Sequence, residues 1–496
     1  MKDGTEYGIG ADGQTLDWDL IPWGSIEKSI RKLRQRIFRA TKEHRWNQVR
    51  SLMKLMLRSY FNLLESVRRV TQKNKGKKTA GVDGVVALTP KARWRLVRQM
   101  VNHTPWKVKP SRRVHIPKPG KPGQTRPLSI PVVRDRIAQA RMKNALEPSW
   151  EARFEPISYG FRPGRSIHDA IRHCWEFFRA NTRRPWILDA DIRSAFDQIS
   201  HNHILQELGP IPGRELVRQW LKAGYVEAEI LHKTETGTAQ GGIISPMLLN
   251  VALHGLQKAL GPAYGYIRYA DDFIVCAGTR EKVEAARTLI QEWLKPRGLE
   301  LHPEKTRVVH IDDGFNFLSF SVRRYRGKCL CKPQKEKVLE FLSKRRSWLN
   351  KHKQAKAENV IRHLNPILRG WANHYRHAVS KEVFSYVSHQ IWQMLWRWCL
   401  RRHPNKGKYW VRNKYFGSPK TKSWRFQAHT NTGVLYLFDI GSTKIERHIK
   451  VTGGASPDDP DLQDYWRQRK NRSTYRVSKQ VTTKALLHAG SDARAD

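Results

Sequence analysis

The strongest constraint on the fold is an acidic dipeptide enclosed by apolar residues at positions 266–276. The sequence Tyr-Ile-Arg-Tyr-Ala-Asp-Asp-Phe-Ile-Val-Cys places β-forming side chains on both sides of Asp271 and Asp272. This pattern predicts a hairpin turn between two buried strands, with both carboxylates at the turn. Adjacent carboxylates supply the hard oxygen ligands that Mg²⁺ prefers. Taken alone, however, the dipeptide is better explained as an ordinary acidic turn.

A second acidic segment changes this interpretation. Residues 186–197 read Trp-Ile-Leu-Asp-Ala-Asp-Ile-Arg-Ser-Ala-Phe-Asp, which places Asp191 at the end of an apolar strand. One further carboxylate beside the hairpin allows two metal ions to be held about 4 Å apart, where they can activate a primer 3′-hydroxyl and stabilise the leaving pyrophosphate. We expect Asp189 and Asp197 to be surface or capping acids.

Positive charge is the dominant global property of the 496-residue chain. Lysine and arginine number 92 against 44 acidic residues, which gives a formal net charge of +48. Such an excess repels itself unless an anionic partner neutralises it, so we expect RNA or DNA, with an anionic membrane as the alternative. The sequence has no run of about 20 uninterrupted apolar residues, which predicts that no segment spans a membrane.

The five cysteines predict neither a disulfide framework nor a zinc site. No two of them form a CxxC pair, and Cys329 and Cys331 lack a second pair or a close set of histidines. We therefore expect buried thiols in a reducing compartment.

Hydrophobic periodicity separates helical regions from a mixed region. Helical spacing begins at Ile26 and recurs over 46–70. Between about residues 110 and 325, short β-type runs and helical runs follow one another irregularly, which indicates an α+β fold around an antiparallel sheet. Three helical stripes with basic outer faces follow in 335–402. The predicted strands are 112–116, 186–191, 267–269, 273–276 and 308–311.

A series of blocks, in order and with consistent spacing, resembles one protein family. The blocks are Gly-Val-Asp-Gly at 81–84, RRVHIPKPGKPGQTRPLSIP at 112–131, YGFRPGRS at 159–166, TAQGGIISP at 238–246, GLELHPEKT at 298–306, FNFLSF at 315–320 and NPILRGWANHY at 365–375. Over roughly residues 75–455 the chain resembles group II intron-encoded reverse transcriptases, also called maturases. The resemblance implies an α+β right-hand polymerase of fingers and palm, followed by an α-helical thumb and a small C-terminal DNA-binding module.

The same resemblance, with the periodicity, predicts the domain boundaries. We expect a mobile arm at 1–24, an N-terminal helical extension and the start of the fingers at 25–110, fingers and palm at 111–325, the thumb or maturase domain X at 335–402, the DNA-binding module at 403–455 and a flexible tail at 456–496.

The resemblance assigns the catalytic acids. It implies that Asp191, Asp271 and Asp272 are the metal ligands and that the carbonyl of Ile192 adds a backbone oxygen. The expected cofactor is a pair of Mg²⁺ ions, which Mn²⁺ can replace.

Contacts with the incoming deoxynucleotide also follow from the resemblance. The residues implied are Lys118, Arg126, Phe196, Gln240 and Lys305. Phe196 stands where such polymerases place a steric gate against the ribose 2′-hydroxyl, which selects by clash; a core position is the alternative. Arg126 and Lys118 would grip the triphosphate, although Lys121 is an alternative to Lys118.

Six further residues are expected to contact nucleic acid. They are Arg112, Arg113, Arg162, Arg165, Gly241 and Arg369. Gly241 permits close approach beneath the nascent base pair. The arginines at 112, 113, 162 and 165 are expected on backbone phosphates, with structural ion pairs as an equal alternative.

The resemblance implies an RNA-directed DNA polymerase that also binds intron RNA to assist splicing and mobility by target-primed reverse transcription. The expected partners are group II intron RNA, target DNA, an RNA template with its DNA primer, and dNTPs, within a ribonucleoprotein in the prokaryotic cytosol or on the nucleoid. Residues 448–457 resemble the start of an HNH endonuclease, but only His488 and no cysteine follow. We therefore expect no endonuclease, and the source of the primer stays open.

Two alternatives share much of this sequence signal. A splicing-only RNA-binding maturase would be expected to have lost its acids, and Asp191, Asp271 and Asp272 are all present. A reverse transcriptase recruited to host defence or repair would have the same active site. An RNA-dependent RNA polymerase is disfavoured by Phe196, because RNA synthesis must accommodate the 2′-hydroxyl.

Overall fold

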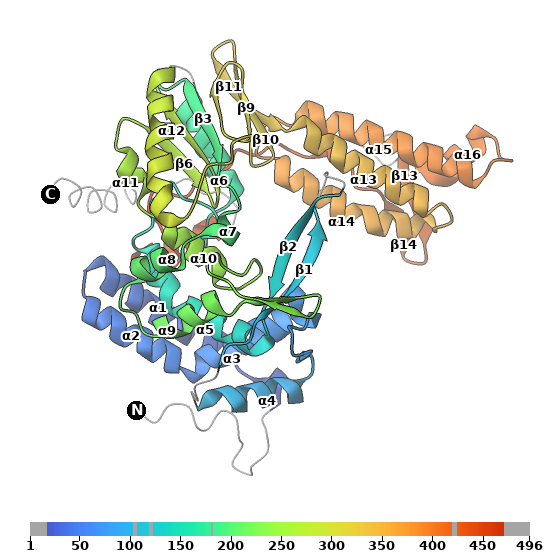
Figure 1. The fold of residues 1–496 in the computed structure, drawn as a ribbon. Coiled ribbons are helices and arrows are strands. Elements are labelled where there is room, and N and C mark those ends of the chain that lie inside the picture. The colour runs from blue at the N-terminus through green and yellow to red at the C-terminus, as the bar shows by residue number, and fades with distance from the viewer. Residues whose placement is uncertain (1–16, 103–106, 119–122, 180–181, 419–423, 471–496) are drawn as a thin grey trace.

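The molecule consists of a helical base, a central region built on a sheet, and a projecting helical thumb (Figure 1). The computed structural model describes residues 17–102, 107–118, 123–179, 182–418 and 424–470. The N-terminal helices lie at the bottom of Figure 1, the palm sheet lies at the upper left, and the thumb helices extend to the right. This arrangement confirms the predicted α+β right-hand fold.

The palm is built on a four-stranded antiparallel sheet. Its strands follow the order β6 (Gly265–Tyr269), β7 (Asp272–Ala277), β3 (Trp186–Asp191) and β8 (Arg307–His310). Successive side chains of a strand point to opposite faces, and in β7 Val275 joins one core whereas Ile274 joins the other. Helices α12 (Arg280–Leu294) and α6 (Ile167–Phe178) supply the cover for these two faces. The predicted palm strands are thereby confirmed.

The fingers combine a second sheet with the N-terminal helices. The sheet order is β2 (Thr125–Ile130), β1 (Ser111–Pro117), β4 (Tyr225–Glu227) and β5 (Ile230–His232). The helices are α1 (Trp23–Lys42), α2 (Trp46–Arg58), α3 (Tyr60–Arg68), α4 (Pro90–Val101) and α5 (Val133–Glu151). The single helix predicted over 46–70 is broken at Ser59, whose hydroxyl accepts the Asn62 N–H and caps a new helix.

The prediction of a mobile arm at 1–24 is wrong where it can be compared. Residues 1–16 lie outside the described residues, whereas Trp18–Leu20 form a 3₁₀ helix and Trp18 is completely buried. The indole of Trp18 packs against Trp23 and edge-on against Trp94 of α4. A single large aromatic side chain can bury a large apolar area. Trp18 therefore anchors this segment, although its sequence has no helical periodicity.

Short helices connect the two sheets. They are α7 (Ala195–Gln198), α8 (His201–Leu208), α9 (Arg214–Lys222), α10 (Ser245–Ala252) and α11 (Leu256–Leu260). Helix α7, which follows β3 in the chain, contacts α10. The residues after β3 therefore lie near α10.

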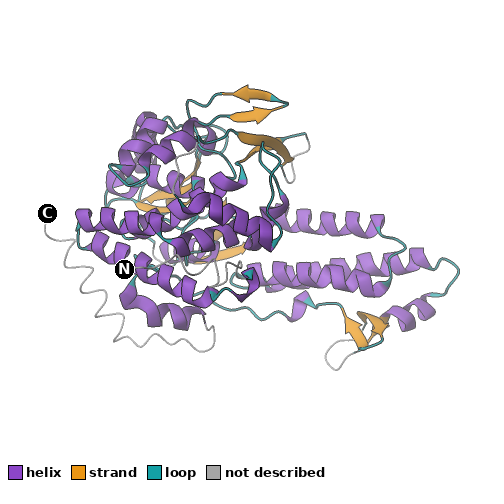
Figure 2. Ribbon diagram, turned by 90° about the horizontal axis from the view of Figure 1, so that it is seen from below, coloured by secondary structure: helices purple, strands orange, loops and turns teal. Residues whose placement is uncertain are grey.

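Three helices form the thumb, as predicted. They are α13 (Lys335–Lys351), α14 (Ala357–Tyr375) and α15 (Lys381–Arg402), and Figure 2 shows them extended away from the rest of the molecule. A three-stranded sheet of β9 (Phe315–Phe317), β10 (Phe320–Tyr325) and β11 (Lys328–Pro333) lies between palm and thumb. Its buried Phe320 packs against Tyr375 at the end of α14, which links the two.

The region 403–455 is not a separate module. Its elements are α16 (Lys408–Tyr415), β12 (Phe416–Gly417), β13 (Arg425–Thr430) and β14 (Gly433–Tyr436). Phe426 of β13 packs against Trp398 of α15 and stacks on Tyr415, so this region shares the core of the thumb. The sequence suggested a boundary at 403 because the helical period ends there, but aromatic packing continues across it.

The predicted tail at 456–496 is wrong for residues 456–470. Here Pro460–Leu462 form a 3₁₀ helix and Gln463–Lys470 form α17, while Ser456 and Asp458 are buried. The polar composition suggested a flexible tail, but these polar side chains form ion pairs with distant elements. Residues 471–496 lie outside the described residues.

Two further properties accord with the composition. All five cysteines are buried and carry free thiols. Over the described ranges, none of the helices combines the length and the apolar character needed to cross a membrane.

Candidate active site

Three carboxylates meet at one edge of the palm sheet. Asp191 ends β3 and is the register partner of Asp272, which begins β7. Asp271 precedes it in the turn after β6, where Ala270 has a φ of 61°. Because a left-handed backbone costs free energy in a residue with a Cβ, this turn needs support from outside the hairpin.

Buried polar contacts supply that support. Nη1 of the fully buried Arg268 donates to the side-chain oxygen of Asn250 (3.0 Å) and to the carbonyl of Ala270 (3.3 Å). The amide of Asn250 donates to the carbonyl of Gly160 (2.8 Å). A Cβ on Gly160 would lie 2.3 Å from the Ala270 nitrogen, so only glycine fits there. Arg268 and Asn250 were not among the predicted site residues, and their only sequence signal is an arginine within the apolar run 266–269.

The backbone beyond β3 is also fixed at this edge. The Ile192 N–H donates to the carbonyl of Asp271 (3.3 Å), and the His302 N–H donates to the carbonyl of Asp191 (2.8 Å). Ile192 also forms an antiparallel bridge with Leu301. The carbonyl of Ile192 therefore belongs to a segment held on both sides.

Burial and neighbouring negative charge disfavour the ionised forms of Asp271 and Asp272. Burial, then the neighbouring Asp271 and Asp191, raise the pKa of Asp272 to about 7. Burial also raises the pKa of Asp271, an effect that Arg126 and Lys305 oppose. Like charges held together in a partly desolvated site favour a bound cation.

The chemistry of these oxygen donors fits a divalent cation. Within the described ranges, no group of three or more His, Cys, Asp or Glu side chains is placed to hold a metal ion. The ammonium of Lys305 forms an ion pair with the carboxylate of Asp191. Metal binding would therefore require Asp191 to exchange this ammonium for the ion.

The predicted triphosphate ligands lie on the β1–β2 hairpin. Burial raises the pKa of Asp271 and of Asp197, and the charge of Arg126 on β2 opposes this rise at both carboxylates. Lys118 has an exposed side chain, and its backbone N–H donates to the Gln124 carbonyl (2.8 Å). Lys121, the alternative to Lys118, lies outside the described residues.

Phe196 lies at the start of α7, next to the acidic edge. Its half-buried ring packs edge-on against Phe161, with ring centroids 6.2 Å apart. Phe161 has a φ of 61° and is 46% exposed, which is a costly combination for a large side chain. Phe196 is therefore partly exposed, and its ring is supported by the ring of Phe161.

Gln240 and Gly241 lie directly beneath the fingers. The carbonyl of Gln240 accepts the Ser129 N–H (2.6 Å), and its side-chain amide donates to Asp197 (3.3 Å). Gly241 has a φ of 117°, and a Cβ there would lie 2.6 Å from the Ser129 carbonyl oxygen. The close neighbour of this glycine in the structure is therefore the protein backbone at Ser129.

Two of the predicted nucleic-acid arginines are structural instead. Arg162 is buried and forms a two-pronged ion pair with Glu151, with N–O distances of 3.0 and 2.9 Å. Arg165 donates to the carbonyls of Pro156 (2.7 Å) and Gly453 (2.9 Å). The sequence could not distinguish these roles, because the partners lie on other elements and Gly453 is 288 residues away.

The remaining arginines are more accessible. Arg112 on β1 and Arg369 on α14 are exposed; Arg369 lies over the Phe438 ring at 5.3 Å. Arg113 stacks on Tyr225 at 3.3 Å, so its guanidinium is already committed on one face.

Comparisons with known proteins agree with this geometry. Residues 116–322 match the family described as reverse transcriptase (RNA-dependent DNA polymerase), 18–100 match the N-terminal domain of reverse transcriptase, and 338–416 match the group II intron maturase-specific domain. The palm, its acidic edge and these matches define a reverse transcriptase.

Relatives narrow the assignment. The chain is 31% identical to the protein YkfC of Escherichia coli, over 62% of this chain and 88% of that one. It is 26% identical to the group II intron-encoded protein LtrA of Lactococcus lactis, over 64% of this chain and 69% of that one. The chain belongs to the family of group II intron-encoded reverse transcriptases and maturases. A Candida albicans telomerase structure aligns at a TM-score of 0.36 and 11% identity, too low to carry an argument.

Proposed function

We propose that the palm edge catalyses RNA-directed DNA synthesis through divalent metal ions held by Asp191, Asp271, Asp272 and the Ile192 carbonyl. The observation that carries the proposal is the register that sets Asp191 opposite Asp272, with Asp271 in the adjoining turn. Two bound Mg²⁺ ions would activate the primer hydroxyl and stabilise the leaving group.

Residues of this chain prepare the acidic edge and position the nucleotide. Lys305 forms an ion pair with Asp191, and we expect its ammonium to contact a phosphate of the incoming dNTP. Arg126 offers that triphosphate a bidentate guanidinium, with Lys118 beside it. Phe196 selects deoxynucleotides by clash with a 2′-hydroxyl, and Gln240 packs beneath the nascent pair.

The thumb and the exposed arginines extend the site along a nucleic acid. Arg112 and Arg369 are proposed phosphate contacts for the RNA template, the intron RNA or the target DNA. The maturase-specific domain supports a role in intron RNA binding and splicing, within a ribonucleoprotein. The free thiols fit a reducing compartment such as the prokaryotic cytosol. Intron-linked action is favoured over recruitment to host defence, because the relatives include a group II intron-encoded protein.

Primer extension tests the polymerase proposal. Asp271→Asn removes a negative ligand while keeping the shape of the side chain. We expect cDNA synthesis on an RNA template with a DNA primer, dNTPs and Mg²⁺ to fall at least about a thousandfold, since metal ligation contributes several kcal/mol in the transition state. RNA binding should be unchanged.

Asp189→Asn is the matched control. Asp189 lies on β3, two residues before Asp191, and its carboxylate pairs with Arg307 at 3.1 Å. We expect this variant to retain synthesis within about a few-fold, as for an exposed ion pair. Full activity of Asp271→Asn, or equal losses in both variants, would contradict the assignment.

A further inference from the structure

A cavity at the junction of palm, thumb and C-terminal segment lies outside the polymerase site. It has a volume of about 330 Å³, within the ~300–1,000 Å³ that small-ligand pockets occupy. Its wall comes from α6 with Phe320 and Cys331 of the neighbouring strands β10 and β11, from residues 377–381 that lead into α15, and from residues 445–448. Regions far apart in the sequence thus build one pocket.

The lining combines an apolar floor with a cationic rim. We call the apolar lining residues Ile171, Trp175 and Phe320 the floor, and the cationic lining residues Arg172, Lys381 and Arg447 the rim. None of the described residues that line the cavity is acidic. Arg172 is paired with Glu176 (3.2 Å), and the ammonium of Lys381 donates to the Gly441 carbonyl (2.6 Å). Arg447 has neither a hydrogen bond nor an ion pair within the part of the chain that the structure describes.

Flat rings supply stacking surfaces within this rim. The Trp175 ring is half-buried, with the Arg172 guanidinium 4.1 Å and the Arg447 guanidinium 6.0 Å from its centroid. His377 and His448 lie against each other with centroids 5.3 Å apart. Burial first, then neighbouring cationic groups, lower the pKa of His377 to about 4, so its ring is neutral at neutral pH.

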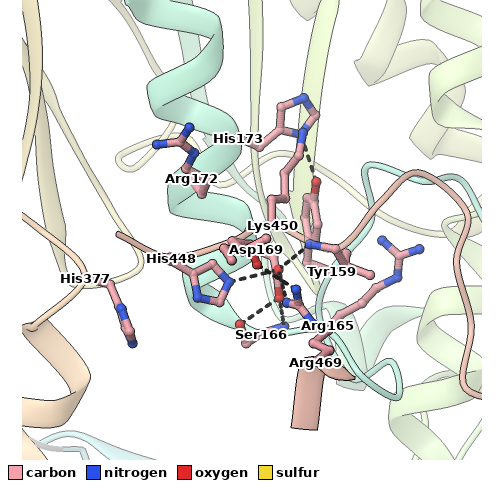
Figure 3. Close-up of polar contacts among 12 residues, drawn as sticks. Tyr159, Arg165, Ser166, Asp169, Arg172, His173, His377, His448, Lys450 and Arg469 are labelled. Atoms are coloured by element: carbon pink, nitrogen blue, oxygen red, sulfur yellow. Dashed lines mark hydrogen bonds and ion pairs between the residues drawn. The ribbon is translucent and has the colours of Figure 1, made fainter. Parts of the chain in front are cut away.

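A buried carboxylate holds the third wall in place. Asp169 on α6 is completely buried and accepts from the ring of His448 (3.0 Å), the Val451 N–H (2.8 Å) and the guanidinium of Arg469 (2.8 Å). It also closes a capping box with Ser166. Figure 3 shows His448 between His377 on the thumb side and Asp169 on the palm side. The pocket is therefore a built feature, not a gap between loosely placed segments.

We propose that this pocket binds one nucleoside monophosphate unit, with its base on the aromatic floor and its phosphate on the cationic rim. A bare phosphate would leave the floor without a partner, and an apolar ligand would leave Arg447 without one. Aromatic stacking with flanking arginines is how sequence-tolerant sites hold single bases. The unit can come from a free nucleotide or from an unpaired nucleotide of a bound RNA. The proposal goes beyond the polymerase activity and does not depend on the metal assignment.

Calorimetry of the full chain with AMP tests the free-nucleotide source. Trp175→Ala and Arg447→Ala should each weaken AMP binding about tenfold, the size of one stacked base or one charged contact. Trp293→Ala is the matched aromatic control, because Trp293 is also half-buried beneath an arginine, Arg297, at 3.3 Å. Arg467→Ala removes a charge from α17 and should change nothing.

Photocrosslinking tests the RNA source. The protein is purified with the RNA that accompanies it, irradiated, digested with nuclease and trypsin, and searched for nucleotide adducts. We expect an adduct on the peptide His173–Arg179, which contains Trp175, and an RNA affinity about tenfold lower for Trp175→Ala. Trp175→Phe should restore binding, which separates stacking from misfolding.

The outcomes separate the sources and the polymerase proposal. AMP binding without the adduct assigns the pocket to free nucleotides, whereas the adduct without AMP binding assigns it to RNA. Absence of AMP binding together with unchanged RNA affinity of the variants overturns the proposal. Primer extension on a short template should keep the wild-type rate in every pocket variant, so failure of one proposal leaves the other standing.

Discussion

The palm hairpin and the C-terminal segment 443–470 are held to the molecule in different ways. The hairpin strands β6 and β7 bury continuous apolar side chains against two cores. The C-terminal segment buries Val451 and Ala455 in one of these cores and adds ion pairs to distant elements. Arg34 of α1 forms a two-pronged ion pair with Asp458, at 2.7 and 2.6 Å, and a third contact with Glu147 at 2.9 Å.

The difference concerns how the stabilisation is distributed. Apolar burial is shared among many side chains, so the palm does not depend on any one of them. The docking of the C-terminal segment includes a few buried charges, chiefly Asp458 and Asp169. Removing one partner of a buried pair leaves the other without compensation. The segment that ties α1, the palm and the thumb together should therefore be releasable by single substitutions.

Asp458→Ala tests this dependence most severely. Arg34 lies in the interior, and its pKa is raised well above the usual range by Asp458 and Glu147 despite burial. Loss of Asp458 should lower the local opening free energy of the segment by about 3 kcal/mol, read by hydrogen exchange of amides in 456–470. Asp464→Ala breaks an exposed pair with Arg467 and should change protection little. Unchanged exchange in Asp458→Ala would show that apolar contacts hold the segment.

The same contrast explains what the sequence could and could not predict. Strands β3, β6, β7 and β8 were predictable because a local period reports burial. The acids at 191, 271 and 272 were predictable because strand ends and turns are local too. The docking of 456–470 depends on Arg34 and Asp169, which are more than 280 residues away, and no period marks such a contact. Arg165 was assigned to nucleic acid for the same reason, since its partner Gly453 is 288 residues away.

Gly160→Ala tests the turn between β6 and β7. We expect this turn to be more sensitive to a single substitution than the strands around it. The added Cβ would meet the Ala270 nitrogen at 2.3 Å, and backbone must move. A displacement of about 1 Å at a reacting centre costs roughly a hundredfold in rate, so primer extension should fall by at least that factor. Thermal unfolding should change much less than activity.

Gly24→Ala is the control for this substitution. Gly24 lies in α1, and an added Cβ there would have no neighbouring atom within 4 Å. Alanine also favours the helix by about 0.5–1 kcal/mol relative to glycine. Activity should be retained. If Gly160→Ala synthesised cDNA at the wild-type rate, the turn at residues 269–272 would not depend on the block at 159–166.

Asp169→Asn tests whether acid releases the C-terminal segment before it opens the palm. Hydrogen bonds from His448, Arg469 and Ser166 hold the pKa of Asp169 well below its usual value, although burial opposes them. A depressed carboxyl pKa stabilises the folded state above the unfolded pKa of about 3.9, and this contribution is lost as the pH falls below that value. Limited proteolysis should therefore release 443–470 in acid before the palm opens. Asp169→Asn should lower the local stability of the segment by about 1–2 kcal/mol, so this variant should already be cleaved faster at pH 7. Its cleavage rate should also depend less on pH in acid.

The smallest expected effect separates the two fates of the predicted nucleic-acid arginines. Each phosphate contact contributes about 0.7–0.9 to the slope of log affinity against log salt. Arg112→Ala should reduce this slope by about one contact, because the side chain is exposed on β1. Arg165→Ala should leave the slope unchanged, because its guanidinium donates to the carbonyls of Pro156 and Gly453. Filter binding of RNA over a range of salt concentrations measures both. Equal slope changes would show that Arg165 exchanges its protein partners for phosphate when RNA binds, which would make the C-terminal segment sensitive to RNA.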